Sequence, residues 1–199
     1  MAKLNSLLLL LLIISFHYIL HIANSASDSK PKAANFIKAE CGATLYPALC
    51  VHCLSSYSTK IQQNKLQLAQ VALSVSLSRA QSVSRFVSKL ARMRGVKTME
   101  YRAVKDCVEN MGGTVDQLSR SMRELGSMSR VAGRDFEWHV SNVETWVSAA
   151  LTYENTCLDG FAGAKMGGNV KVAIRRRVLN CAQVTSNALA LVNRFAARH

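Results

Sequence analysis

Proline and acidic residues are both scarce in this chain of 199 residues. The two prolines, Pro31 and Pro47, precede residue 50, so no proline interrupts a helix beyond that point. Lys and Arg number 25 against 12 Asp and Glu, which gives a formal net charge of +13. Such a charge suits nucleic acid, an acidic protein, an anionic polysaccharide or simply a soluble surface. Secretion, for which the N-terminus argues, counts against nucleic acid.

Recognisable catalytic motifs are also missing. The chain has no Gly-x-Ser-x-Gly elbow, no glycine-rich phosphate loop and no HExxH motif around His139. Its helical carboxylates are expected on solvated faces, where acid–base chemistry is uncommon; they include Glu109, Asp116, Glu144, Glu154 and Asp159. The sequence therefore indicates a binding protein rather than an enzyme, and it predicts no cofactor and no metal site.

The first 25 residues are typical of a signal peptide. Lys3 supplies a positive charge, residues 7–22 form an apolar run, and Ala23-Asn24-Ser25 is a small-residue cleavage site. The alternative is a membrane anchor, but two histidines interrupt the run, which falls short of the roughly 20 apolar residues that span a bilayer. We expect residues 1–25 to be removed and residues 26–199 to form one secreted domain without a stable membrane anchor.

Hydrophobic periodicity predicts four long helices in the rest of the chain. Apolar residues recur every three or four positions over 64–93, 104–126, 140–157 and 174–195. Asp135 is expected to cap the third helix, and the glycine-rich segment 160–168 separates the third helix from the fourth. Gly112 and Gly113 each cost roughly 1 kcal/mol in helix propensity and mark a place for a kink. Long helices with short connections predict an antiparallel four-helix bundle.

The N-terminal part of the mature chain predicts a smaller helical hairpin. Residues 35–58 carry two short helical patterns, which Gly42 and the pair Tyr46-Pro47 separate. All six cysteines lie in the mature region, where secretion makes disulfides the default, but spacing alone does not choose their pairing. They are Cys41, Cys50, Cys53, Cys107, Cys157 and Cys181.

One cysteine pair also has the spacing of a redox dithiol. Cys50 and Cys53 are separated by two residues, and His52 between them suggests a metal corner. A redox motif requires a βαβ context, and zinc requires a second ligand pair, both of which the sequence lacks. Structural cysteines are the favoured interpretation, and a secreted redox enzyme is the alternative.

Several segments together resemble the plant invertase and pectin methylesterase inhibitor family. Residues 41–50 resemble the opening of its members, in which two cysteines eight residues apart flank a Tyr-Pro pair. Similar matches cover 104–107, 146–161 and 185–192, so the resemblance extends over essentially the whole mature chain. It implies an all-α, disulfide-stapled four-helix bundle with an N-terminal helical hairpin, secreted to the apoplast and cell wall.

The family resemblance also implies how the cysteines are used. It implies disulfides Cys41–Cys50 and Cys107–Cys157, the second of which joins two bundle helices. Cys53 and Cys181 lie outside the four-cysteine pattern of the family. We expect them to be free and buried, with a third disulfide between them as the alternative.

The family resemblance implies that the target is pectin methylesterase. Inhibitors of this family cover the substrate cleft of that enzyme and catalyse no reaction themselves. Matching positions give Glu109, Thr156 and Asp159 as expected contacts, while Gly112 and Gly113 stand where many members carry acidic residues. Acid invertase is the alternative target, but the Pro-Lys-Phe tripeptide associated with that activity is absent. A further alternative is a non-inhibitory wall protein that binds anionic pectin. The basic charge also favours a weak contact between an inhibitor and anionic pectin.

Overall fold

The computed structural model describes residue 14 and residues 31–93, 98–128, 134–163 and 168–197. All regular elements in these residues are helical, which confirms the all-α fold. The expected signal peptide lies outside the described residues apart from Ile14. Within the part of the chain that is described, no helix combines the length and apolarity needed to cross a membrane.

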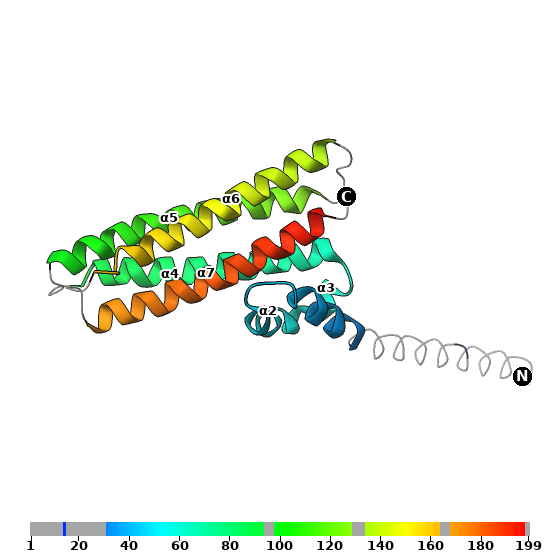
Figure 1. The fold of residues 1–199 in the computed structure, drawn as a ribbon, viewed down its shortest axis with the longest axis horizontal. Coiled ribbons are helices and arrows are strands. Elements are labelled where there is room, and N and C mark those ends of the chain that lie inside the picture. Colours follow the sequence, from blue (N-terminus) through cyan, green and yellow to red (C-terminus); the bar gives the residue numbers. More distant parts are fainter. Residues whose placement is uncertain (1–13, 15–30, 94–97, 129–133, 164–167, 198–199) are drawn as a thin grey trace, which may run out of the picture.

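Four long helices form an antiparallel bundle. They are α4 (Lys65–Ala91), α5 (Thr98–Ser127), α6 (Arg134–Asp159) and α7 (Asn169–Ala196). Each packs against its neighbours in the chain, and α7 also packs against α4, so the four helices close into a ring around one core. Figure 1 shows α5 and α6 side by side on one side of the bundle, with α4 and α7 on the other.

The helix boundaries follow from local signals, and one expected signal is wrong. Asn64 caps α4, because its side-chain oxygen accepts a 3.0 Å hydrogen bond from the Gln67 backbone N–H. Asp135 does not cap α6, since this helix already includes Arg134 and Asp135 lies in its first turn. The aspartate still stabilises the helix there, because a negative charge near the N-terminus interacts favourably with the helix dipole.

A smaller helical unit packs against one end of the bundle. Residues 31–41 are helical, and α2 (Pro47–Leu54) follows after a turn, with proline at its first position. A disulfide joins Cys41 to Cys50 and so ties these two helices together. The unit is longer than the hairpin predicted for 35–58, because a short 3₁₀ turn, Ser55–Tyr57, and α3 (Ser58–Ile61) lead on to α4.

Two buried polar residues, Glu40 and Asn187, make contacts that hold this N-terminal unit on the bundle. Glu40 is buried and pairs with Arg194 Nε at 2.7 Å and with Lys65 Nζ at 3.4 Å. Burial alone would raise the pKa of Glu40, but the Arg194 hydrogen bond and the two positive charges outweigh it and hold that pKa below its usual value. The Asn187 side chain accepts a hydrogen bond from the Tyr46 N–H (3.1 Å) and donates one to the Tyr46 carbonyl (2.9 Å).

Candidate protein-binding face on helices α5 and α6

A disulfide between Cys107 and Cys157 locks α5 to α6 near one end of the bundle. Both cysteines are buried, and their Cα atoms lie 4.5 Å apart across 50 residues of sequence. In the loop-entropy model a bond closing a loop of this length stabilises the fold by roughly 4 kcal/mol. Residues that flank the two cysteines are therefore carried on a rigid pair of helices.

Other contacts keep the same antiparallel register along the pair. In the middle of α5, Thr114 Oγ1 donates to the Ala150 carbonyl at 3.4 Å. Towards the other end, His139 Nδ1 lies 2.7 Å from Glu124 Oε1, whose oxygen also accepts from the Asn142 amide. Side chains on the facing ridges of α5 and α6 can therefore be matched level by level along the bundle.

The three expected contact residues all lie exposed on this pair of helices. The register places Glu109 level with Thr156, because these residues follow and precede the two linked cysteines respectively. Asp159 lies one helical turn beyond Thr156 and ends α6. Neither Glu109 nor Asp159 forms an ion pair with any other described residue, so both carboxylates remain available to a partner.

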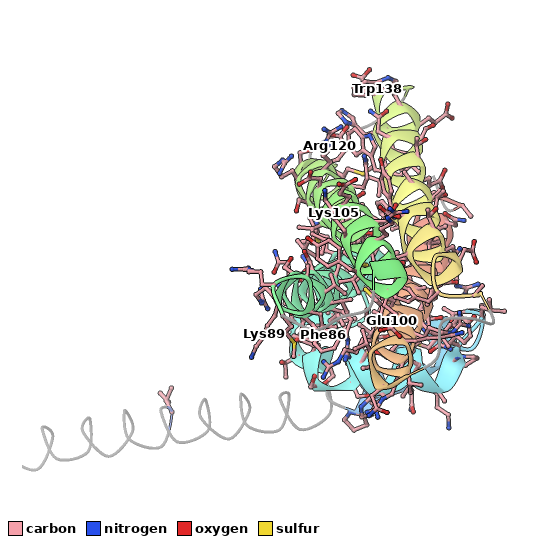
Figure 2. All side chains as sticks on the ribbon, turned by 90° about the vertical axis from the view of Figure 1, so that its left-hand side faces the viewer. Phe86, Lys89, Glu100, Lys105, Arg120 and Trp138 are labelled. Atoms are coloured by element: carbon pink, nitrogen blue, oxygen red, sulfur yellow. A yellow bond between two sulfur atoms is a disulfide. The ribbon has the colours of Figure 1, made fainter. Side chains whose placement is uncertain are left out.

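Two outward ridges carry these residues. On α5 the ridge has a period of four and on α6 a period of three, so the members of each ridge share one face of their helix. The α5 ridge is Tyr101, Lys105 and Glu109, and the α6 ridge is Tyr153, Thr156 and Asp159. Every one of these side chains is exposed, and Figure 2 shows Lys105 projecting from α5. We call these six residues the double ridge.

Close contact between the two helices explains one of the two adjacent glycines. The sequence marked Gly112 and Gly113 as a place where α5 could kink, but the helix continues through both residues without a break. A Cβ atom on Gly113 would lie only 2.9 Å from the ring of Tyr153, whereas a Cβ on Gly112 would meet nothing within 4 Å. Gly113 therefore lets the ring of Tyr153, a member of the double ridge, lie directly against α5.

Three exposed aromatic residues on this face were not among the expected contacts. Tyr101 is 44% exposed, Tyr153 is 37% exposed and Trp138, at the opposite end of α6, is 62% exposed. Aromatic side chains are enriched among the residues that dominate binding energy in protein interfaces. For two of the three, exposure could have been predicted from the sequence, because Tyr101 and Trp138 lie outside the apolar stripes of their helices.

A buried polar cluster lies in the core behind this face. Glu154 of α6 was expected on a solvated face with the other helical carboxylates, and this is wrong, because it is completely buried. Its Oε1 accepts hydrogen bonds from Thr185 Oγ1 (3.0 Å) and Cys181 Sγ (3.1 Å) of α7. Thr185 in turn shares a 2.7 Å hydrogen bond with Ser76 of α4. Glu154 Oε2 is buried without a hydrogen-bond partner in the described residues. This cluster joins three helices, and its four side chains are completely buried, away from any substrate at the surface.

Burial controls the titration of this cluster. Removal from water raises the pKa of Glu154 to about 7, although the hydrogen bonds from Cys181 and Thr185 act in the opposite direction. Burial likewise raises the pKa of the Cys181 thiol, and the neighbouring Glu154 carboxylate adds to that shift. A thiol with a raised pKa is a poor nucleophile. Cys181 is therefore a structural residue of the core.

The cysteine pairing removes the redox interpretation of Cys50 and Cys53. Cys50 is bonded to Cys41, and Cys53 and Cys181 are free, so no disulfide joins them. The two disulfides are the pairs that the family resemblance implies. Cys181 is buried as expected, whereas Cys53 is only half-buried. Among the described residues, no group of three His, Cys, Asp or Glu side chains could hold a metal ion.

A protein-family model described as plant invertase/pectin methylesterase inhibitor matches residues 35–191. The chain belongs to this family. It is 54% identical over 177 residues to pectinesterase inhibitor 9 of Arabidopsis thaliana, with 87% of each chain covered. It is 47% identical over 183 residues to pectinesterase inhibitor 11 of the same plant, and this alignment covers 88% of this chain and 91% of the relative.

Solved structures agree with this family assignment at the level of the fold. The crystal structure of a mutant form of a pectin methylesterase inhibitor from Arabidopsis matches with a TM-score of 0.62 and 21% sequence identity. The match covers 77% of this chain and 92% of that chain. The family consists of inhibitors rather than enzymes, which accounts for a sequence without a catalytic motif.

Proposed function

We propose that the mature protein is a secreted inhibitor of pectin methylesterase, which binds the enzyme reversibly and covers its substrate cleft. Inhibition of this kind would modulate the methylesterification of pectin in the apoplast and cell wall. The proposal is supported by family membership and by relatives named as pectinesterase inhibitors that align over most of their length.

The observation that carries the proposal is the double ridge on a disulfide-locked pair of helices. Binding costs entropy when side chains and loops become ordered, and residues on rigid helices lose less of it. The backbones that present Glu109 and Thr156 are fixed by the Cys107–Cys157 bond. Thr156 is fixed further, because its Oγ1 donates to the Thr152 carbonyl at 2.8 Å and leaves its lone pairs free to accept from a partner.

The composition of the double ridge suits a protein surface better than a polysaccharide. It combines two tyrosines with two carboxylates and a single lysine, Lys105. Carboxylates would repel a pectin chain that carries negative charge, whereas they bind Lys, Arg or hydroxyl groups of a protein. We infer that the double ridge contacts the enzyme directly, with Glu109 and Thr156 at the centre and Asp159 towards the edge.

Secretion is part of the same proposal. The signal peptide proposed for residues 1–25 would direct the protein to the compartment where pectin methylesterase meets its substrate. The intact mass of protein collected from a plant secretion system tests this step. The measured mass should correspond to a chain that begins at or next to residue 26. A mass that corresponds to a chain with most of residues 1–22 still attached would contradict the proposal.

The inhibition itself is tested with two substitutions in the double ridge. Glu109→Lys reverses a central charge, and Thr156→Trp places a bulky ring where the two surfaces must meet. Central interface residues are each worth on the order of 1 to 3 kcal/mol, so each variant should weaken inhibition about tenfold or more. Titration of plant pectin methylesterase with purified inhibitor measures the effect, and circular dichroism checks that the bundle remains folded.

Matched controls separate the contact from a general change of charge or size. Glu137→Lys makes the same charge reversal at the opposite end of α6, and Ser74→Trp adds the same ring on exposed α4. Both controls should inhibit like the parent protein. The same preparations are assayed on cell-wall acid invertase. Inhibition of invertase without inhibition of pectin methylesterase would overturn the proposal, as would parent-like inhibition by both double-ridge variants.

A further inference from the structure

The basic charge of the protein is concentrated on one pair of helices. α4 and α7 contain no Asp or Glu, yet together they carry nine Lys and Arg residues. All acidic residues of the four long helices lie on α5 and α6. Because α4 and α7 pack against each other across the bundle from the α5–α6 pair, the basic face and the double ridge lie on opposite sides.

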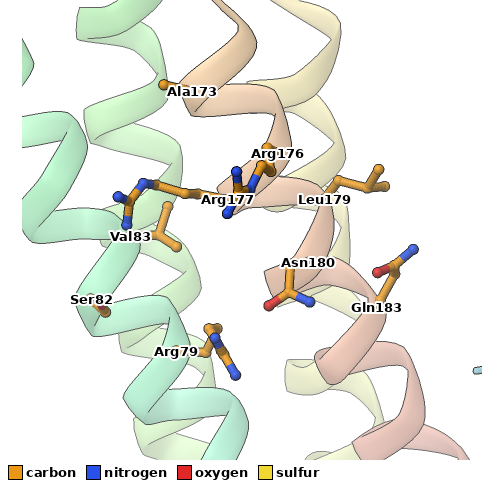
Figure 3. Close-up of a pocket in the computed structure, with 9 residues that line it drawn as sticks. All are labelled: Arg79, Ser82, Val83, Ala173, Arg176, Arg177, Leu179, Asn180 and Gln183. Atoms are coloured by element: carbon orange, nitrogen blue, oxygen red, sulfur yellow. The ribbon is translucent and has the colours of Figure 1, made fainter. Parts of the chain in front are cut away.

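A groove with a volume of about 790 Å³ lies between these two basic helices. Figure 3 shows Arg79 projecting from α4, with Arg176 and Arg177 projecting from α7. Asn180 and Gln183 line the α7 side, next to Leu179, which is 47% exposed. The groove therefore combines three positive charges with two amides and an apolar side chain.

The three guanidinium groups are not neutralised by the protein. None of them forms an ion pair with a described Asp or Glu residue, and no acidic residue lines the groove. Arg177 crosses from α7 to α4, where its guanidinium lies 4.2 Å from the centre of the Phe86 ring. Stacking on an aromatic ring holds the guanidinium in place while its N–H groups remain free to donate.

The positive surface continues beyond the groove along α4. A second hollow of about 500 Å³ is lined by Arg85, Lys89 and Arg92, together with two serines. Figure 2 shows Phe86 and Lys89 on the same helix. An extended row of positive charges fits a polymer with repeated negative charges better than a single small anion.

We propose that the α4–α7 groove binds a polyuronate, a chain of sugar rings with free carboxylates, in the form of de-esterified pectin. Each arginine presents a planar pair of N–H donors that matches a carboxylate. The Asn180 and Gln183 amides can donate to and accept from sugar hydroxyls, and Leu179 offers an apolar contact to the face of a ring. The choice of this polyuronate rests on the proposed function, because removal of methyl esters by the target enzyme creates these free carboxylates.

Binding at this groove would leave the double ridge free. The two surfaces lie on opposite sides of the bundle, so a pectin chain and the enzyme could be held at the same time. The inhibitor would then be concentrated on de-esterified stretches of pectin, where the enzyme has just acted. Exposed ion pairs are screened by salt, so this binding should weaken as ionic strength rises.

Isothermal titration of the mature protein with polygalacturonate, in the absence of enzyme, tests the proposal. The parent protein should bind polygalacturonate and should not bind pectin that is fully methyl-esterified. The triple variant Arg79→Gln, Arg176→Gln, Arg177→Gln should lose about tenfold or more in affinity, because it removes three charge-assisted contacts. A control variant with Arg102→Gln, Arg120→Gln and Arg123→Gln loses the same charge from exposed α5 positions and should bind within about twofold of the parent.

Each other outcome overturns the inference. Equal loss in both triple variants would show that net charge rather than the groove carries the binding. Equal binding of esterified pectin would exclude the carboxylates. Tighter groove-dependent binding of heparin or duplex DNA would assign the groove to another polyanion. Because the titration contains no enzyme, its result can be interpreted even if the protein does not inhibit pectin methylesterase. If the protein does inhibit the enzyme, the groove variant should inhibit it like the parent.

Discussion

The two halves of the bundle share one architecture but differ in how they are held together and in what they present to solvent. α5 and α6 are joined by a disulfide, approach closely at Gly113, and carry ten of the acidic residues. α4 and α7 have no covalent link, and their inner contact includes the hydrogen bond between Ser76 and Thr185. This second pair carries basic but no acidic residues, and the N-terminal unit packs against part of it.

This difference suggests a division of labour. A rigid face suits recognition of another folded protein, because little entropy is lost when it docks. A basic groove with several equivalent charges suits a flexible polymer, which binds through repeated weak contacts rather than one fixed geometry. The same core supports both faces, since each helix buries its apolar stripe and leaves the opposite surface free to vary.

Loss of the covalent link should produce the largest change in stability. Replacing Cys107 and Cys157 by alanine removes a bond that closes a loop of 50 residues, which should cost roughly 4 kcal/mol of unfolding free energy. The matched change at Cys41 and Cys50 opens a loop of only nine residues and should cost somewhat less, about 2.5 kcal/mol. Urea unfolding of the two double variants compares them, and an equal or reversed order would contradict the loop-length argument.

Inhibition should separate the same two variants even more clearly. The variant without Cys107–Cys157 should inhibit less well under conditions where it remains folded, because the double ridge loses its rigid support. The variant without Cys41–Cys50 should inhibit like the parent, since its bond lies in the N-terminal unit. If both inhibit equally, rigidity of the α5–α6 pair does not contribute to binding.

The polar core that links α6 to the basic pair should make stability depend on pH. The Glu154 carboxyl has an ordinary pKa of 4.5 in the unfolded chain and a pKa of about 7 in the folded protein. Between these values the folded state binds more protons than the unfolded state, so stability falls as pH rises from about 4.5 to 7 and then levels off. The shift corresponds to at most about 3 kcal/mol.

Glu154→Gln provides the control for this effect. The glutamine is neutral at every pH and keeps a side-chain oxygen that can accept from Thr185 and Cys181. The variant should therefore show a flatter dependence of unfolding free energy on pH, with its advantage over the parent largest above pH 7. Chemical unfolding at a series of pH values measures this, and parallel curves for parent and variant would contradict it.

The fold was largely predictable from the sequence, because apolar residues recur with helical period and glycines mark the ends of segments. Asp135 lies in the first turn of α6, two residues beyond the cap position, since helix dipole and cap preferences favour the same residue type at nearby positions. The double ridge was only partly predictable. Exposure of Glu109, Thr156 and Asp159 follows from periodicity, but their alignment depends on the register between α5 and α6, which only the folded chain sets.

Two further features were not predicted from the sequence. Glu154 was expected on a solvated face, yet it lies in step with the apolar stripe of α6, between Ala150 and Cys157, and is completely buried. The polar cluster that accommodates it draws Ser76 and Thr185 from two other helices, which only the folded chain brings together. The groove between α4 and α7 likewise combines arginines that are about 100 residues apart in the chain. Charge counting identifies a basic protein, whereas packing decides where the charges gather.

The adjacent glycines of α5 give the smallest expected effect and a direct test of close packing on the rigid half. Gly112→Ala should stabilise the protein by about 1 kcal/mol, because alanine favours the helix and its Cβ meets no atom within 4 Å. Gly113→Ala has the same intrinsic gain, but its Cβ would lie 2.9 Å from the Tyr153 ring and must displace it. Tyr153 is partly exposed, so the ring can move outward, and the net change should be close to zero. Thermal unfolding of both variants measures the difference.

Inhibition should fall only for Gly113→Ala, where the displaced ring disturbs the double ridge. Equal stabilisation with unchanged inhibition in both variants would mean that the contact between Gly113 and Tyr153 has no role in shaping this face.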